Sequence, residues 1–235
     1  MTAIIDYGVG NLFSLQSSLL AVGENAIVTS NKSDLENADR LILPGVGAFR
    51  DARLALSNSG LEESILPLIK EGKPILGICL GMQLLFEKDF EDGQYTGLSL
   101  IPGQVRPIKE AIDVASNNNL QVSLTNSNSS VDITYSANST NPINPSDFKI
   151  PHIGWNSLIF TKPSKLFKYI KNGDYVYFVH SYHATECQNW TTSVTEYGAM
   201  LTASVEKDNV YGTQFHPEKS STVGLSILKA FTEIT

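Results

Sequence analysis

The stretch Pro74-Ile75-Leu76-Gly77-Ile78-Cys79-Leu80-Gly81 joins an apolar run to the start of a helical pattern, with a cysteine at the junction. A glycine stands two residues away from Cys79 on each side. A strained strand-to-helix turn needs small neighbours, and it lifts a nucleophile clear of the sheet edge. The positive end of the following helix also favours a thiolate. The stretch therefore predicts a strand over 74–78 and an elbow presenting Cys79, although an isolated cysteine in an apolar segment is more often structural.

Short apolar runs alternate with helical patterns through the first half of the chain. Strands are expected at 3–7, 26–29, 40–43 and 74–78, and helices at 11–22, 49–70 with a break at Gly60, and 80–87. This alternation predicts an α/β fold with a central, mostly parallel sheet and helices on both faces. Active sites of such sheets lie at the carboxyl ends of the strands, where the Cys79 elbow falls.

The second half is richer in strand patterns. Strands are expected at 98–105, 175–183, 199–205 and 210–215, followed by a closing helix at 221–231. These runs predict antiparallel additions to the sheet. Because a chain of 235 residues with 42% apolar content can bury one sizeable core, we expect a single domain over 1–235.

A polar segment at about 110–149 separates the two halves. It is dominated by Asn, Ser and Thr, as in Asn117-Asn118-Asn119 and Ser127-Asn128-Ser129-Ser130. Its few Val, Leu and Ile residues suffice for a short hairpin, but they are too sparse to predict a packed core. We interpret the segment as an insertion at the surface of the domain.

Composition and charge exclude several classes of protein. The formal net charge of −7 and scattered Lys and Arg residues give no basic surface for nucleic acid. The chain shows no charged and apolar leader and no apolar run long enough for a membrane helix, so we expect a cytoplasmic protein with no membrane contact. Two distant cysteines, Cys79 and Cys187, do not form a disulfide framework, which leaves Cys79 free to react.

A thiolate nucleophile needs a base and a group that orients the base. Gln214-Phe215-His216-Pro217-Glu218 supplies both directly after an apolar strand. His216 can serve as the base, and Glu218 can hold its tautomer, with the proline fixing the turn between them. Spacing alone does not separate this pair from a surface histidine beside a solvated carboxylate.

The turn Leu43-Pro44-Gly45-Val46-Gly47-Ala48 ends a strand and opens a helix. Its backbone N–H groups can point toward an oxyanion forming near Cys79. The turn has neither the dinucleotide nor the triphosphate glycine pattern, and the histidines show no zinc-ligand spacing. We therefore expect no cofactor and no metal.

Together these elements resemble the class I, or triad-type, glutamine amidotransferases. Gly77-Ile78-Cys79-Leu80-Gly81-Met82-Gln83 is similar to their nucleophile motif, and Gln214 to Glu218 to their His-Glu motif. Within them, the chain most resembles the glutaminase subunits of imidazole glycerol phosphate synthase. That choice is carried by Ile5-Asp6-Tyr7-Gly8-Val9-Gly10-Asn11-Leu12, Pro151-His152-Ile153-Gly154-Trp155-Asn156 and Tyr177-Phe178-Val179-His180-Ser181-Tyr182.

The resemblance implies hydrolysis of glutamine to glutamate and ammonia through a Cys79 thioester, with His216 and Glu218 completing the triad. The oxyanion would be held by backbone groups of Gly45, Val46, Gly47 and Leu80. Glutamine would be positioned by Gln83, Glu91, His180, Ser181 and Tyr182.

The resemblance also implies a partner, because free ammonia would be protonated and lost. The expected partner is a (β/α)₈-barrel cyclase that forms a heterodimer with this chain and receives ammonia for imidazole glycerol phosphate and aminoimidazole carboxamide ribonucleotide in histidine biosynthesis. Asn11, Trp155 and Lys219 match positions that face the cyclase, although a core tryptophan is the alternative for Trp155. By the same analogy, the turn from Pro44 to Gly47 holds an inactive orientation until the cyclase binds its substrate.

The insertion departs from this family pattern. Relatives pass from the strand near Arg106 to the Pro151-His152 motif with roughly thirty fewer residues, so the connection here is unusually long. A disordered loop is the favoured interpretation, and an added contact with the cyclase is the alternative.

Three other functions remain open at this point. The chain could supply ammonia to a diverged synthase in surface-polysaccharide sugar biosynthesis, which would share these motifs. It could be a cysteine peptidase of similar elbow architecture, which the Gln83 and His216-Pro217-Glu218 context disfavours. A regulatory subunit with an inactive triad is disfavoured because Cys79, His216 and Glu218 are all present.

Overall fold

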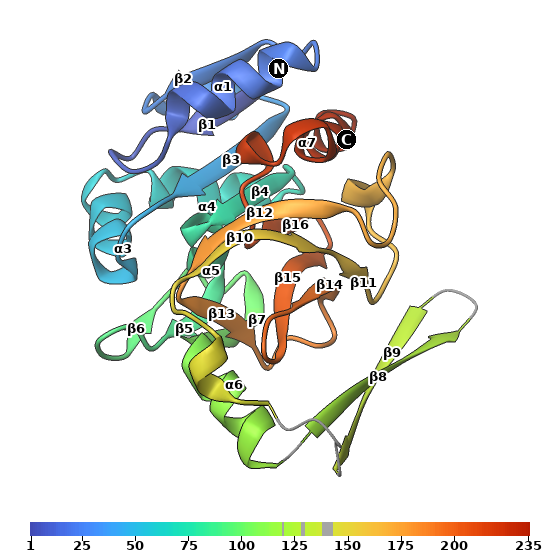
Figure 1. Cartoon of the computed structure of the whole chain (residues 1–235). Coiled ribbons are helices and arrows are strands. Elements are labelled where there is room, and N and C mark those ends of the chain that lie inside the picture. Colours follow the sequence, from blue (N-terminus) through green and yellow to red (C-terminus); the bar gives the residue numbers. More distant parts are fainter. Residues whose placement is uncertain (119, 128–129, 138–142) are drawn as a thin grey trace.

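An eight-stranded sheet forms the centre of the protein (Figure 1). The computed structural model describes residues 1–118, 120–127, 130–137 and 143–235. Five neighbouring strands of the sheet are parallel: β2 (Ala26–Thr29), β1 (Thr2–Ile5), β3 (Arg40–Gly45), β4 (Ile75–Cys79) and β16 (Val210–Thr213). The sheet continues antiparallel through β15 (Met200–Lys207), β14 (Thr191–Glu196) and β11 (Ile159–Phe160). The expected parallel sheet with antiparallel additions is confirmed.

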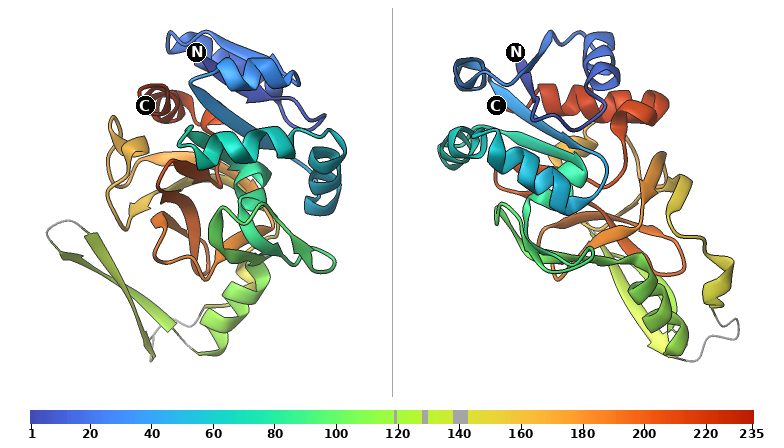
Figure 2. Two further views of the ribbon diagram at one scale, coloured as in Figure 1. Left: turned by 180° about the vertical axis from the view of Figure 1, so that it is seen from behind. Right: turned by 90° about the vertical axis from the view of Figure 1, so that its left-hand side faces the viewer.

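Helices cover both faces of the parallel strands (Figure 2). One face carries α1 (Leu12–Ala21) and α7 (Ser221–Thr232), and the other carries α2 (Lys32–Asn37), α3 (Phe49–Asn58) and α4 (Glu62–Lys70). Successive strand residues point to opposite faces, so Ile4 and Ile42 pack under α1 and α7 while Leu41 and Leu43 pack under α3 and α4. The expected break in helix 49–70 is confirmed, and the short α2 was not predicted.

The elbow after β4 is built as predicted, but its helix is short. Cys79 adopts φ 56°, a left-handed conformation that is strained for a side chain with a Cβ. A Cβ at position 81 would overlap the carbonyl oxygen of Leu43, and one at position 77 would lie 2.6 Å from the carbonyl oxygen of Gly81. The glycines therefore allow the helix α5 (Leu80–Leu84) to press against β3 and β4.

The expected helix over 80–87 is wrong beyond Leu84. Residues Phe86–Asp89 form β5, because Phe86 is fully buried and pairs with Ile101 in a second sheet. That sheet has the order β13 (Tyr182–Thr185), β7 (Ile101–Pro107), β5 and β6 (Tyr95–Thr96). Tertiary pairing thus overrides the helical continuation.

The expected strand over 175–183 is divided at Ser181. Its first part, β12 (Tyr175–His180), pairs with β10 (His152–Ser157), and its second part, β13, pairs with β7. The run therefore passes from one sheet to another at Ser181, which lies at the boundary between the two sheets.

The polar segment contains more regular structure than expected. Its first residues belong to α6 (Ile108–Asn117), where Ile112 and Ala115 are buried against Ala199 and Leu201, so the prediction that 110–149 lacks packed residues is wrong at this end. The strands β8 (Leu120–Ser127) and β9 (Ser130–Ala137) form the hairpin that the sequence allowed, as a separate two-stranded sheet (Figure 1). Short 3₁₀ helices lie at η1 (Pro145–Asp147), η2 (Lys165–Phe167) and η3 (Pro217–Lys219).

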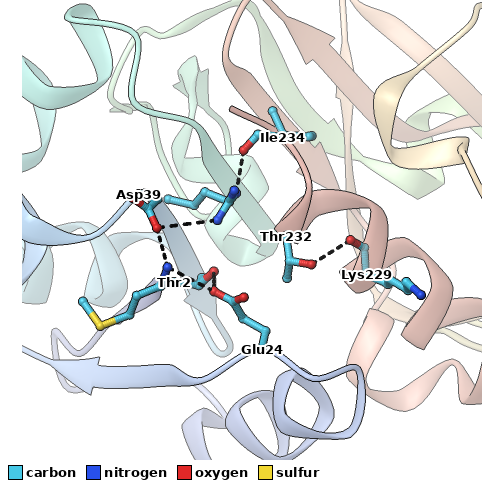
Figure 3. A network of polar contacts seen from close by, with 8 residues as sticks. Thr2, Glu24, Asp39, Lys229, Thr232 and Ile234 are labelled. Carbon is cyan, nitrogen blue, oxygen red and sulfur yellow. Dashed lines mark hydrogen bonds and ion pairs between the residues drawn. The ribbon is translucent and has the colours of Figure 1, made fainter.

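Polar contacts fix the amino end of the parallel strands (Figure 3). The hydroxyl of Thr2 donates a hydrogen bond to Glu24 at 2.7 Å. Arg40, at the start of β3, donates to the carbonyl oxygen of Ile234 and lies beside Asp39. These contacts join β3 to the end of α7, and they secure the strand whose other end carries the glycine-rich turn. Within the described ranges, no helix is long and apolar enough to cross a membrane.

Gly81→Ala should destabilise the protein by at least about 3 kcal/mol, because the new methyl group would meet the rigid backbone of Leu43. Gly72→Ala is the matched control: its Cβ would enter open space, and only the positive φ of 103° would cost about 1 kcal/mol. Urea unfolding of both variants measures the difference. Equal losses would contradict the packing role of Gly81.

Candidate active site

A pocket of about 400 Å³ opens at the carboxyl ends of β3 and β4 and collects most of the predicted site residues. Eleven of the predicted residues line it: Val46, Gly47, Cys79, Leu80, Gln83, Glu91, His180, Ser181, Tyr182, His216 and Lys219. Pro151 and Val179 complete the lining and were not predicted. Glu218 and Gly45 lie just behind this pocket, where they line a small void together with His216 and Asn11.

The Cys79 thiol lies at the floor of the pocket, between polar groups of two other elements. Its Sγ lies 3.9 Å from the carbonyl oxygen of Val179, to which the thiol can donate. The side-chain Nε2 of Gln214 donates toward Sγ at 3.7 Å. Since Cys79 is only 7% exposed, a substrate must enter the pocket to reach its thiol.

His216 and Glu218 form the predicted pair at the end of β16. His216 Nδ1 and Glu218 Oε1 are 2.8 Å apart, and both side chains are almost fully buried. The backbone of His216 is fixed as well, because its N–H donates to the carbonyl oxygen of Tyr177 and its own carbonyl accepts from the Ser220 hydroxyl. Glu218 is the second residue of η3, and Pro217, the first, favours the start of this helical turn.

The surroundings of His216 favour its protonated form. Burial of the ring by itself lowers the pKa of His216, but the neighbouring Cys79 and Glu218 side chains favour the charged ring more strongly and raise its pKa to about 9. Among the described residues, Nε2 of His216 has no aligned hydrogen-bond partner. Nε2 is therefore free to exchange a proton with a group in the pocket.

The glycine-rich turn lies beside the elbow, because the strands that lead to them, β3 and β4, are paired. Gly45 is paired with Cys79 across β3 and β4, and Gly47 has φ 92°, a conformation that favours glycine. The hydroxyl of Tyr7 donates to the carbonyl oxygen of Pro44 at 2.7 Å. Burial, together with the charge of Cys79, raises the pKa of Tyr7 well above its usual range, so its hydroxyl remains a donor. Tyr7 thus supports the start of this turn, a contact that motif reading did not identify.

Glu91 connects the pocket to the start of α3. Its carboxylate accepts a hydrogen bond from the backbone N–H of Phe49, and its own N–H donates to Asp89 at 2.7 Å. Burial raises the pKa of Asp89 to about 7, and the nearby charge of Glu91 adds to this shift while the Glu91 N–H opposes it. Glu91 therefore lies on a loop that is held against the pocket.

His180 belongs to a buried pair of histidines. Its Nδ1 lies 2.8 Å from the carbonyl oxygen of Tyr182, and its Nε2 lies 3.0 Å from Nδ1 of His152. Burial lowers the pKa of both rings, to about 3 for His180 and about 4 for His152. Since the Tyr182 carbonyl can only accept, His180 carries its proton on Nδ1, and Nε2 accepts from His152. His152 was quoted in a motif but received no role.

The residues predicted to face a partner are distributed around this site. Trp155 is 48% exposed on β10, which excludes the alternative of a core tryptophan. Lys219 lines the pocket, and Asn11 accepts a hydrogen bond from the Ser14 N–H at the start of α1.

The comparisons with known proteins agree with this geometry. A family model described as glutamine amidotransferase class-I matches residues 3–234. The chain therefore belongs to the class-I glutamine amidotransferase family.

Several relatives with a similar sequence are named imidazole glycerol phosphate synthase subunit HisH. That of Caldanaerobacter subterraneus subsp. tengcongensis is 46% identical, with 100% of this chain and 98% of the relative covered. Those of Geobacter metallireducens and Methanothermobacter thermautotrophicus are each 41% identical, covering 97% and 100% of this chain and 96% and 98% of the relatives. Within its family, the chain groups with these HisH subunits.

Solved structures of much lower identity share the fold. PurLQS of Thermotoga maritima matches with a TM-score of 0.64 at 14% identity, covering 98% of this chain and 96% of the other. A crystal structure described as a glutamine amidotransferase matches with a TM-score of 0.63 at 15% identity, covering 98% and 97%. These likenesses confirm the architecture.

Glu218→Gln should lower the pKa of His216 from about 9, because the variant removes one of the negative charges that stabilise the protonated ring. The folded-state pKa lies above the ordinary value of 6.5, so this stabilisation is fully present below about pH 6.5 and is lost as the pH rises through about 9. NMR titration of the imidazole and urea unfolding across this range measure both effects. Glu233→Gln, at an exposed ion pair, is the control; an unchanged His216 titration in Glu218→Gln would contradict the assignment.

Proposed function

We propose that this chain is the glutaminase subunit of an imidazole glycerol phosphate synthase. The observation that carries the proposal is the convergence of a strained nucleophile elbow and a buried His-Glu pair on one pocket, in a chain that groups with HisH subunits. The chemistry is hydrolysis of glutamine to glutamate and ammonia. The ammonia is passed to a partner subunit and not released to solvent.

The reaction begins with attack of the Cys79 thiolate on the side-chain amide carbon of glutamine. The protonated His216 then delivers its proton to the departing nitrogen, so that ammonia leaves and a glutamyl thioester remains. A water molecule gives a proton to the neutral His216 and attacks the thioester, which releases glutamate and restores the Cys79 thiolate beside the protonated His216. Glu218 holds Nδ1 of His216 throughout, so that Nε2 faces the reacting atoms.

Backbone groups of Leu80 and of the turn from Gly45 to Gly47 stabilise the negative oxygen of the tetrahedral intermediates. The support for this role is their position: Gly45 is the strand neighbour of Cys79, and Val46, Gly47 and Leu80 line the pocket. The flexible glycines allow the turn to change orientation when the partner subunit binds its substrate. We assign the control of activity to this turn.

The pocket offers matching groups for the amino-acid end of glutamine. Glu91 supplies a carboxylate for the α-ammonium group, and the segment from His180 to Tyr182 supplies backbone groups and a hydroxyl. Gln83 lines the same pocket, and its amide nitrogen is engaged with the Tyr182 carbonyl and the Gln214 side chain. His180 remains neutral because of its low pKa, so it does not repel the substrate ammonium group.

The partner is a (β/α)₈-barrel cyclase that forms a heterodimer with this chain and consumes ammonia in histidine biosynthesis. Trp155 supplies an exposed aromatic anchor on β10, Asn11 caps the start of α1, and Lys219 is the last residue of η3. Ile153 is on the same strand and is 58% exposed. An exposed apolar surface beside the active site suits a partner that must receive ammonia before it reaches solvent.

Cys79→Ala should reduce glutamine hydrolysis by at least a factor of about a thousand, because the variant has no nucleophile. The measurement is glutamate production by the full chain mixed with the cyclase subunit from the same source, with and without the cyclase substrate. Wild-type activity should rise when the cyclase and its substrate are added. Residual hydrolysis by Cys79→Ala at the wild-type rate would exclude the proposed chemistry, and equal wild-type rates under all conditions would exclude the regulatory role of the turn.

Trp155→Ala should weaken binding of the cyclase by at least about 2 kcal/mol, or about thirtyfold in Kd, if Trp155 is a central anchor. Isothermal titration measures this affinity. Tyr169→Ala is the matched control, since Tyr169 is an aromatic residue of similar exposure, 45%, in another part of the chain. Wild-type affinity in Trp155→Ala would remove this residue from the interface.

A further inference from the structure

A chain of buried hydrogen bonds leads from the glutamine-binding segment to the sulfur of Cys79. It starts at the carbonyl oxygen of Tyr182, which accepts from His180 Nδ1 at 2.8 Å and from Gln83 Nε2 at 3.4 Å. Gln83 Nε2 also donates to Oε1 of Gln214 at 3.0 Å. Gln214 Nε2 then lies 3.7 Å from Cys79 Sγ. This chain joins five elements: β12, β13, α5, the end of β16 and, through Cys79, β4.

The direction of every bond in the chain follows from the Tyr182 carbonyl. A carbonyl oxygen can only accept, so the nitrogen end of the Gln83 amide must face it. The same nitrogen lies next to Gln214, which must therefore present its oxygen to Gln83. The nitrogen of Gln214 is left facing Cys79. The network thus fixes an amide orientation that would otherwise be ambiguous.

Burial makes this orientation hard to change. Gln214 is fully buried, and Gln83 is 6% exposed. Rotation of the Gln214 amide by half a turn would place its nitrogen against the nitrogen of Gln83 and its oxygen against the sulfur. Two buried N–H donors would then face each other without an acceptor, which is costly away from water. The backbone is held too, since the Gln214 N–H donates to the carbonyl oxygen of Ala203 at 2.8 Å.

We propose that Gln214 is a further catalytic residue, which donates an N–H group to Cys79 Sγ and thereby favours the reactive thiolate over the thiol. A donor stabilises a charged acceptor more than a neutral one. Gln83 serves as the positioning residue that keeps this donor directed at the sulfur. The effect on thiol reactivity stands by itself, and its consequence for catalysis rests on the proposed glutaminase function.

The position of Gln214 also separates this role from substrate binding. Gln214 is not among the residues that line the pocket, whereas Gln83 is. Loss of the Gln214 amide should therefore change how fast the sulfur reacts, and it should leave the contacts with glutamine in place. This predicts an effect on kcat with little change in KM.

The test is the rate at which iodoacetamide alkylates Cys79 in the full chain at pH 7, with Cys79→Ala as the background. Gln214→Met keeps the length of the side chain and removes both hydrogen bonds, so it should react about tenfold more slowly. The thiolate absorbance in the ultraviolet, measured against Cys79→Ala, should fall in parallel. Cys187 does not interfere, because it is 2% exposed and burial raises its pKa.

Thr213→Val is the matched control. Thr213 is the neighbour of Gln214 on β16, is fully buried, and within the described structure its hydroxyl has no hydrogen-bond partner. This variant should be alkylated within twofold of the wild-type rate. If Gln214→Met reacts at the wild-type rate, or if Thr213→Val is slowed equally, the proposal is overturned.

Gln83→Met covers the case in which Gln214→Met does not fold, as judged by circular dichroism. It frees the Gln214 amide to rotate, so alkylation should be slower than in wild type, and a wild-type or faster rate overturns the proposal. Glutamine kinetics of folded Gln214→Met should then show a lower kcat at unchanged KM. Since alkylation requires no glutamine, a slow alkylation rate in a chain without glutaminase activity would reject the proposed function and leave the role of Gln214 intact.

Discussion

The close packing of backbone on backbone at the end of β4 is the constraint on which the site depends. Gly81 lies so near the carbonyl oxygen of Leu43 that no side chain fits there. A side chain at Gly77 would likewise collide with the backbone of Gly81 and Met82. This packing forces Cys79 into a left-handed conformation and directs its thiol to the open end of the sheet. The pocket and the glycine-rich turn after β3 are arranged around that one strained residue.

The chemistry then comes from neighbours that reach the thiol from separate elements. His216 follows β16, the strand beside β4, and Gly45 ends β3, the strand on the other side. The buried Glu218 and the nearby sulfur together keep His216 charged despite its burial. A rigid sheet thus holds the proposed acid, the proposed nucleophile and the proposed backbone donors in place, which is the condition for electrostatic stabilisation of a transition state.

Local sequence patterns predicted the elements that carry this site. They failed where contacts between residues far apart in the sequence determine the secondary structure. The Cys79 elbow and the His216-Glu218 pair could be read because glycine spacing and strand ends are local signals. The helix after the elbow was overextended, since Phe86 is drawn into a strand by a partner that lies 15 residues further along. The roles of Tyr7 and Gln214 depend on which groups meet in the folded interior, and no spacing in a single sequence records that.

The division of the strand run at Ser181 allows two parts of the site to move separately. This residue is the only one between β12, which pairs with β10, and β13, which pairs with β7. The segment that we propose to bind glutamine therefore lies at the boundary between two sheets. Cys79 and His216, in contrast, follow adjacent strands of the large sheet. Under the proposed function, a small shift between the sheets would weaken or strengthen glutamine binding and would leave the distance between Cys79 and His216 unchanged. The affinity for glutamine and the reactivity of Cys79 would thereby depend on different sheets of one domain.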